Sequence, residues 1–228
     1  TFSVDSSARI IYARLRVSGV AGQSVWINPA GGALETAANW SAMPASAAGT
    51  RVLFGEFPSA LAAVSLDTAF TVGQMTVSNA NAYTFSGAGS LTLDNGASSP
   101  SVTVGAGSHT LSLPVTPAAA LTVNTLGNAS LTANGAIGGS SALVKQGSGE
   151  LVLTAANTYA GGTTVQGGTL SLQQGAALST GTVSLTTSGV RLRSTGSLPV
   201  TISNMVVAAV SGTALDAVAP MIFLGTLD

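Results

Sequence analysis

Three kinds of residue are absent or scarce in this sequence of 228 residues: cysteine, histidine and charged residues. The absence of cysteine excludes disulfides and thiolate metal sites, and His109 is the only imidazole available as a base or a ligand. Charged residues make up 7% of the chain, and the formal net charge is -1. Because so few cations give no field that attracts nucleic acid or anionic lipid, we expect neither as a partner.

Long apolar runs are also missing. The longest apolar tracts lie at 205–210 and 220–224, and Ser211 and Pro220 interrupt this region. No tract reaches the roughly 18 residues that a membrane-spanning helix needs, so we expect no membrane span. The chain starts at Thr1 without a basic stretch followed by an apolar one, so we expect any signal peptide to have been removed or to lie upstream.

Apolar residues are nevertheless plentiful, at 46% of the chain. From Leu66 to Ile202, strand-like apolar segments recur at a mean spacing of roughly ten residues, without a convincing helical period. Two or three such strands per coil give a repeat of about 20 to 30 residues, which predicts an all-β solenoid, a parallel β-helix. A β-sandwich is the alternative, although the Asn-Gly turns that favour its hairpins occur only at Asn95–Gly96 and Asn134–Gly135.

The segment 141–172, SALVKQGSGELVLTAANTYAGGTTVQGGTLSL, shows this pattern most clearly. Its short apolar and threonine-rich strands are separated by glycines, where the chain can reverse without a Cβ penalty. Burial of its few aliphatic side chains does not offset the conformational entropy that ordering the segment costs. Such a unit must therefore stack on neighbours of the same kind.

The same segment resembles a known repeat. In residue type and spacing it is similar to the autotransporter-associated β-strand repeat, also called the passenger-associated transport repeat, with Glu150 where a Thr is usual and one clear copy. The resemblance implies turns of a right-handed β-helix in a secreted or surface-exposed bacterial protein, and it implies no catalytic residue. The positions that carry it are Leu143, Lys145, Gly147, Gly149, Leu151, Leu153, Asn157, Thr158, Tyr159, Gly161, Thr163, Val165, Gly168, Thr169 and Leu170.

The chain divides into three regions. In residues 1–17, arginines alternate with apolar residues, which predicts the terminal strand of a preceding β domain or a linker. Residues 18–60 contain both tryptophans and resemble the lead-in or cap segment that often precedes such repeats in large secreted bacterial proteins. Residues 61–228 are expected to form the β-helix repeats. Because no polar cap closes the apolar C-terminal run, we expect the chain to be part of a longer polypeptide.

The aromatic residues have two interpretations. A solenoid has an apolar end that needs covering, and the bulky side chains of Trp26 and Trp40 could plug it. Alternatively, Trp26, Trp40, Tyr83 and Tyr159 are candidate ligand-binding residues, since rings on an exposed face can form a platform for a sugar.

The ionisable residues indicate no catalytic, metal or cofactor site. The carboxylates are spread singly along the chain, and no nucleotide-binding motif or serine-nucleophile motif occurs. We expect His109 to be a solvent-facing strand residue, and Lys145 and Glu150 could form an exposed pair across a turn, which would contribute little. We therefore predict no catalytic residue, no metal and no cofactor.

The leading functional hypothesis is a non-enzymatic β-helix segment that serves as a stalk, spacer or adhesive passenger of a secreted or surface-displayed bacterial protein. Its partners would be the rest of a longer polypeptide and, in an adhesive role, a glycan or another cell-surface partner. The alternative is a carbohydrate-binding module attached to a polysaccharide-degrading enzyme. A β-helix glycan lyase or hydrolase is a third, weaker hypothesis, because few groups could act as acid or base.

Overall fold

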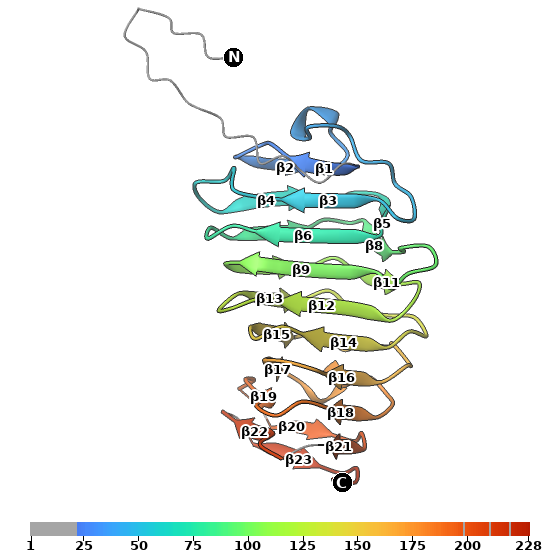
Figure 1. Ribbon diagram of the computed structural model, residues 1–228, viewed down its shortest axis with the longest axis vertical. Coiled ribbons are helices and arrows are strands. Elements are labelled where there is room, and N and C mark those ends of the chain that lie inside the picture. Colours follow the sequence, from blue (N-terminus) through green and yellow to red (C-terminus); the bar gives the residue numbers. More distant parts are fainter. Residues whose placement is uncertain (1–21, 198, 210, 219) are drawn as a thin grey trace, which may run out of the picture.

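The computed structural model describes residues 22–197, 199–209, 211–218 and 220–228, which form a parallel β-helix of about eight turns. Figure 1 shows the strands stacked as rungs along the long axis of the molecule. The described residues contain no α-helix, and adjacent strands pair in parallel. The predicted all-β solenoid is confirmed, and its right-handed sense stays a prediction. The predicted strand within residues 1–17 lies outside the described part of the chain.

Two nine-stranded sheets form two sides of the rod. In spatial order, sheet A consists of β1 (Gln23–Trp26), β3 (Arg51–Phe54), β6 (Gln74–Ser78), β9 (Ser101–Ala106), β12 (Leu121–Thr125), β14 (Leu143–Gln146), β16 (Thr163–Val165), β18 (Val183–Leu185) and β21 (Val206–Ala208). Sheet B consists of β2 (Gly31–Ala33), β4 (Ala62–Ser65), β7 (Tyr83–Ser86), β10 (Ser108–Leu111), β13 (Ser130–Ala133), β15 (Glu150–Leu153), β17 (Thr169–Leu172), β19 (Arg191–Ser194) and β22 (Ala214–Ala217).

Shorter segments complete the third side. They are β5 (Ala69–Val72), β8 (Ser90–Leu93), β11 (Val115–Pro117), β20 (Val200–Ile202) and β23 (Met221–Phe223), with the 3-10 helix η2 (Gly175–Leu178). A second 3-10 helix, η1 (Ala37–Asn39), lies at the end of the rod (Figure 1). Because consecutive strands fall in different sheets, the chain winds around the axis. Each strand then pairs with the equivalent strand of the next coil. The β-sandwich alternative is wrong, because its strands would pair antiparallel within two facing sheets.

The core is built from side chains that alternate along each strand. In β13, Leu131 and Ala133 are buried while Ser130 and Thr132 face solvent, as the two-residue period of a strand requires. The register stacks inward residues of successive coils on one another. One such column in sheet B contains Leu131, Leu151, Leu170 and Leu192, all of them buried. Burial of each leucine contributes about 1.5 to 3 kcal/mol.

Glycines at the corners let neighbouring coils approach at the sheet spacing. Gly147 has φ +73°, and a Cβ added there would lie 2.2 Å from the carbonyl oxygen of Thr125 in the previous coil. A Cβ on Gly135 would lie 1.8 Å from the oxygen of Leu113. Any larger residue at either position would therefore push two coils apart.

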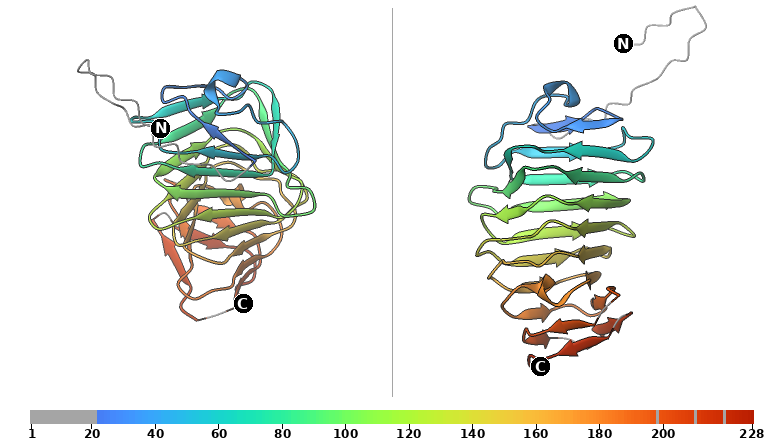
Figure 2. Two further views of the ribbon diagram at one scale, coloured as in Figure 1. Left: turned by 45° about the horizontal axis from the view of Figure 1, so that its top comes forward. Right: turned by 180° about the vertical axis from the view of Figure 1, so that it is seen from behind.

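The two ends of the described stack differ. Figure 2 shows the η1 segment lying against the end that contains β1 and β2. At the opposite end, β22 and β23 each have a strand partner on one side only, whereas β21 is also hydrogen-bonded to residues 226–228. Apolar side chains are exposed there, and they belong to Val218, Ile222, Leu224 and Leu227.

Candidate functional site

The aromatic residues expected to bind a ligand are buried in the rod. Trp26 and Trp40 meet edge to face with ring centroids 5.1 Å apart, and Phe54 packs against both. Tyr83 joins the same cluster, with its ring centroid 5.5 Å from that of Phe54. Tyr159 lies elsewhere, also buried. The structure thus brings three of the four candidates together, but none of the four has an exposed ring.

The polar atoms of these rings have partners inside the protein. The indole nitrogens of Trp26 and Trp40 donate to the carbonyl oxygens of Asn28 and Leu34, at 2.7 Å each. The hydroxyl of Tyr83 donates to the oxygen of Gly55 at 3.0 Å. Burial raises the pKa of the Tyr83 phenol. These hydrogen bonds satisfy the groups that an external ligand would otherwise contact.

Tyr159 makes a hydrogen bond to a residue close in the chain. Its hydroxyl lies 2.7 Å from the hydroxyl of Thr163. Burial raises its pKa to about 12, so the phenol stays neutral at physiological pH.

An amide and carboxylate network closes the first coil beside the tryptophans. Asn28 donates to the side chain of Asn39 at 2.8 Å, and Asn39 donates to the oxygen of Ala33 at 2.7 Å. Glu35 accepts hydrogen bonds from Asp67 and Thr68 in the next coil. Burial alone would raise the pKa of Glu35, but its hydrogen bonds outweigh this and lower the pKa. The network joins the N-terminal coil to its neighbour.

His109 is buried, which corrects the prediction that it faces solvent. Only 1% of the residue is exposed, because His109 occupies an inward position of β10, between the outward Ser108 and Thr110. Its Nδ1 accepts the backbone N–H of Tyr83 at 3.0 Å, and its Nε2 lies 2.7 Å from the oxygen of Ala106. Burial lowers the pKa of the imidazole, although the Ala106 hydrogen bond opposes this.

Lys145 is also buried, so the predicted exposed pair with Glu150 is wrong. Its residue exposure is 0%, and the ammonium donates to the carbonyl oxygens of Gln146, Gly147 and Gly167, at 2.7, 3.0 and 3.1 Å. Burial lowers the pKa of Lys145 to about 8, although the charge of Glu150 raises it. The Glu150 carboxylate accepts a hydrogen bond from the Ser171 hydroxyl. Lys145 therefore joins two coils at a corner.

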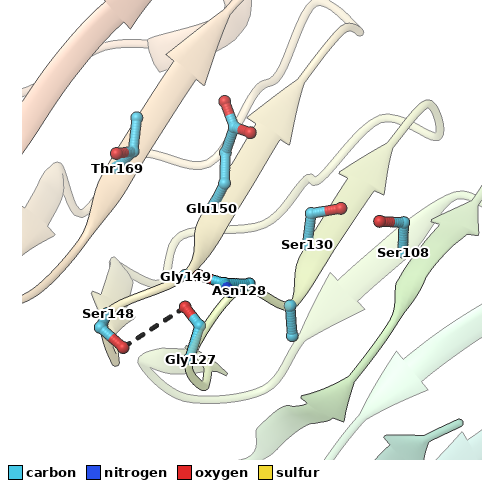
Figure 3. Close-up of a pocket in the computed structure, with 9 residues that line it drawn as sticks. Ser108, Gly127, Asn128, Ser130, Ser148, Gly149, Glu150 and Thr169 are labelled. Carbon is cyan, nitrogen blue, oxygen red and sulfur yellow. Dashed lines mark hydrogen bonds between the residues drawn. The ribbon is translucent and has the colours of Figure 1, made fainter. Parts of the chain in front are cut away.

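A shallow polar depression lies on sheet B. Figure 3 shows the side chains of Ser108, Ser130, Glu150 and Thr169 in a row on successive strands, beside the turns that carry Gly127 and Ser148. The depression has a volume of about 350 Å³ and contains one carboxylate and no cationic or imidazole group in its lining. It can exchange hydrogen bonds with a polar molecule, but it lacks the paired acid and base that glycan cleavage needs.

The outward face of sheet A carries hydroxyl and amide groups in register. One rank runs through Thr76, Thr103, Asn124 and Gln146, and the Gln146 amide donates to Gln166 in the following coil at 2.8 Å. From β6 to β18, the outward residues of this described sheet include no charged side chain. The face is therefore polar but almost without charge.

The described residues show neither a metal cluster nor a membrane helix. Within the ranges that the structure describes, no three potential metal ligands come together. The ion pair between Arg191 and Asp216, at 2.6 Å, lies on the outside of sheet B. In the same part of the chain, no helix has the length and apolar character needed to cross a membrane.

Fold and surface together define a parallel β-helix with polar sides. Its buried ionisable side chains do not converge on one site. Residues 143–172 match the family model of the Passenger-associated-transport-repeat, which confirms the repeat predicted from the sequence. This repeat is associated with autotransporter passengers, which are secreted or surface-located. No curated protein and no solved structure matches the chain significantly.

The structure gives the polar positions of this repeat a physical role. Besides Lys145, the buried Asn157 accepts the backbone N–H of Ile137 at 2.8 Å and donates to the oxygen of Ala177 at 2.6 Å. It thus connects the coil before it with the coil after it on the third side, which is less regular than the two sheets. The matched residues hold coils together.

Proposed function

We propose that this β-helix is a non-enzymatic structural segment of the passenger of a secreted or surface-displayed bacterial protein, in which it serves as a stalk or spacer. The uninterrupted pairing of sheets A and B along the described rod carries the proposal. Backbone hydrogen bonds between coils run along the axis, so the stack resists bending and holds its two ends apart.

The chemistry of the matched repeat supports this role. Its cationic residue Lys145 and its aromatic residue Tyr159 are both buried, and each hydrogen-bonds to other parts of the solenoid. A repeat whose distinctive residues point inward contributes to coil stacking. It leaves the outward positions of the same strands free to vary.

The other roles have weaker support. A carbohydrate-binding module would present aromatic rings to solvent, whereas Trp26, Trp40, Tyr83 and Tyr159 are buried. An adhesive passenger would need a contact surface, and the outward face of sheet A offers mostly hydroxyl and amide groups. A glycan lyase or hydrolase would need converging acids and bases, which the depression around Glu150 lacks. A spacer needs none of these features.

Deletion of single coils tests the proposal. Leu121 pairs with Leu143, and Leu143 pairs with Thr163, so removal of residues 121–142 or of residues 143–162 deletes one coil and keeps the register. Only the second deletion removes most of the matched repeat. Each version is fused between an N-terminal epitope and an outer-membrane translocator. Circular dichroism then reports folding, and antibody labelling of intact cells reports display.

We expect both shortened rods to fold and to display the epitope as the parent chain does, because coil stacking is the proposed activity. Loss of display in the second deletion alone, with its fold intact, would give the repeat a specific role and contradict the proposal. Binding of a glycan by the parent chain that one outward-facing substitution abolishes would contradict it as well.

A further inference from the structure

The imidazole of His109 replaces part of a β-ladder between two coils. Both of its partners are backbone groups with fixed roles: the N–H of Tyr83 can only donate, and the oxygen of Ala106 can only accept. Nδ1 must therefore be unprotonated, and Nε2 must carry the hydrogen. Both hydrogen bonds therefore require the neutral form of the ring. They join the imidazole to Tyr83 on β7 and to Ala106.

The step between these coils is irregular in both sheets. In sheet B, β7 and β10 pair only through Thr84 with Thr110 and through Phe85 with Leu111. The adjacent steps, from β4 to β7 and from β10 to β13, each align four residue pairs. In sheet A, the register between β6 and β9 shifts after Val77. The imidazole contact thus supports the step where backbone pairing is shortest in this part of sheet B.

No charged group compensates a proton on this ring. Tyr83 on β7 is the titratable neighbour, with ring centroids 5.9 Å apart, and burial raises its pKa, so it stays neutral. On the other side, β13 pairs Leu131 with His109, and the end of β9 and the residue after it contribute Ala106 and Gly107. Within the described residues, no carboxylate contributes to the pKa of His109, which burial lowers.

We propose that His109 makes the step from β7 to β10 an acid-sensitive junction of the rod, which opens when the imidazole takes up a proton. Protonation puts a hydrogen on Nδ1, where it faces the N–H of Tyr83, so two donors oppose each other and the buried Tyr83 amide loses its acceptor. The coils on either side have complete ladders and stay stacked. Such an opening is a property beyond the proposed stalk role.

The direction of the pH effect follows from the two states of the ring. In the closed rod, the imidazole binds its proton below the ordinary pKa of about 6.5, whereas in the opened junction it has that ordinary pKa. The open state therefore binds more protons as the pH falls below 6.5, and opening becomes easier in acid.

Hydrogen exchange of the 228-residue chain at pH 7.5 and at pH 5.0, corrected for intrinsic exchange rates, tests the proposal. We expect the opening constant for the amides of β7 to rise at pH 5.0. The upper limit is about thirtyfold, which a proton with pKa near 6.5 in the open state supplies when the closed state takes up none. The amides of β13 and β15 should change far less, because these strands pair with β10, with each other and with β17 through backbone groups alone.

His109→Asn is the matched control, because its Oδ1 can accept the Tyr83 N–H and does not titrate. In this variant the rise in the opening constant should disappear. A second readout needs no variant: the sequence has one histidine, so proton NMR of the ring gives its pKa directly, and we expect a value below 6.5. An imidazole that titrates at or above 6.5, no rise in the opening of β7, or an equal rise in His109→Asn would overturn the proposal.

Discussion

At the scale of single residues, a histidine and a lysine of this rod occupy core positions. His109 and Lys145 point inward at positions that equivalent strands fill with aliphatic residues: Lys145 pairs with Val123 and Val165, and His109 pairs with Leu131. Both use backbone groups as partners. Since the partners are main-chain atoms at a corner, these side chains fix the path of the chain as well as filling space.

Because the ammonium of Lys145 is buried, we predict that the free energy of unfolding rises with pH above 8. Burial lowers its pKa from 10.5 to about 8, so between these values the unfolded chain holds a proton that the folded chain has released. The free energy of unfolding should therefore increase by about 1 to 2 kcal/mol from pH 8 to pH 9.5. Urea denaturation at each pH measures this.

Lys145→Met is the control for this prediction, because methionine has similar length and no charge. The variant should lack the rise between pH 8 and pH 9.5. A slope equal to that of the parent chain would contradict the assignment of the effect to Lys145. The range stops at pH 9.5 because the raised pKa values of Tyr83 and Tyr159 begin to act in the opposite direction near pH 10.

Both core positions carried a signal in the sequence. Leu143 and Lys145 are two residues apart, as are His109 and Leu111, so a strand period of two places each ionisable residue on the same face as a leucine. The ionisable type of these two residues predicted exposure to solvent, whereas the strand pattern predicted burial in the core. The pattern was correct. The hydrogen bonds that stabilise the buried groups were not predictable, because they come from turns whose path the sequence does not specify.

At the scale of the element, the turn glycines decide how closely two coils stack. Gly127 and Gly147 occupy equivalent turns in consecutive coils, between β12 and β13 and between β14 and β15, and both have positive φ. They differ in what surrounds them. A Cβ at Gly127 would meet nothing within 4 Å, whereas one at Gly147 would meet the backbone of Thr125.

This contrast makes the pair a test of coil spacing. We expect Gly147→Ala to cost roughly 2 to 4 kcal/mol, because it adds a steric clash to the strain of positive φ. Gly127→Ala should cost about 1 kcal/mol, the strain alone. Thermal or urea denaturation of the two variants compares them directly, and equal costs would show that coil spacing does not depend on Gly147.

The strands themselves were largely predictable from the sequence. Their arrangement was only partly predictable. Alternating segments such as residues 121–125 and 130–133 have the apolar spacing of strands, and stacking followed from their small apolar content. The sequence did not reveal that both tryptophans, Phe54, Tyr83 and Phe85 form one buried cluster. Trp26, Phe54 and Tyr83 are far apart in the chain, and only the coil register brings them together.

At the scale of the whole molecule, the rod has sides with little charge and one apolar end. The exposed fractions at that end include 68% for Val218 and 72% for Leu224. Strands with one unpaired edge and exposed apolar side chains favour association with another such end.

We therefore predict that the 228-residue chain self-associates through its β23 end. Leu224→Lys should weaken this association roughly tenfold or more, because it replaces an apolar contact with a charge. Sedimentation at several concentrations measures it. Leu61→Lys is the matched control, since Leu61 is 65% exposed but belongs to an earlier coil. An equal effect of both substitutions, or a chain that stays monomeric, would contradict the prediction.

The central claim is that successive coils lie at a constant spacing along one axis, and spin-label distances test it most directly. The chain has no cysteine, so label pairs can be introduced without competing thiols. Gln74 and Thr164 lie in one rank of sheet A four steps apart, and Val207 lies two steps further. At about 4.8 Å per step, the account predicts separations of roughly 19 Å for Gln74 with Thr164 and roughly 29 Å for Gln74 with Val207. A Gln74 to Val207 distance equal to or shorter than the first would contradict the β-helix.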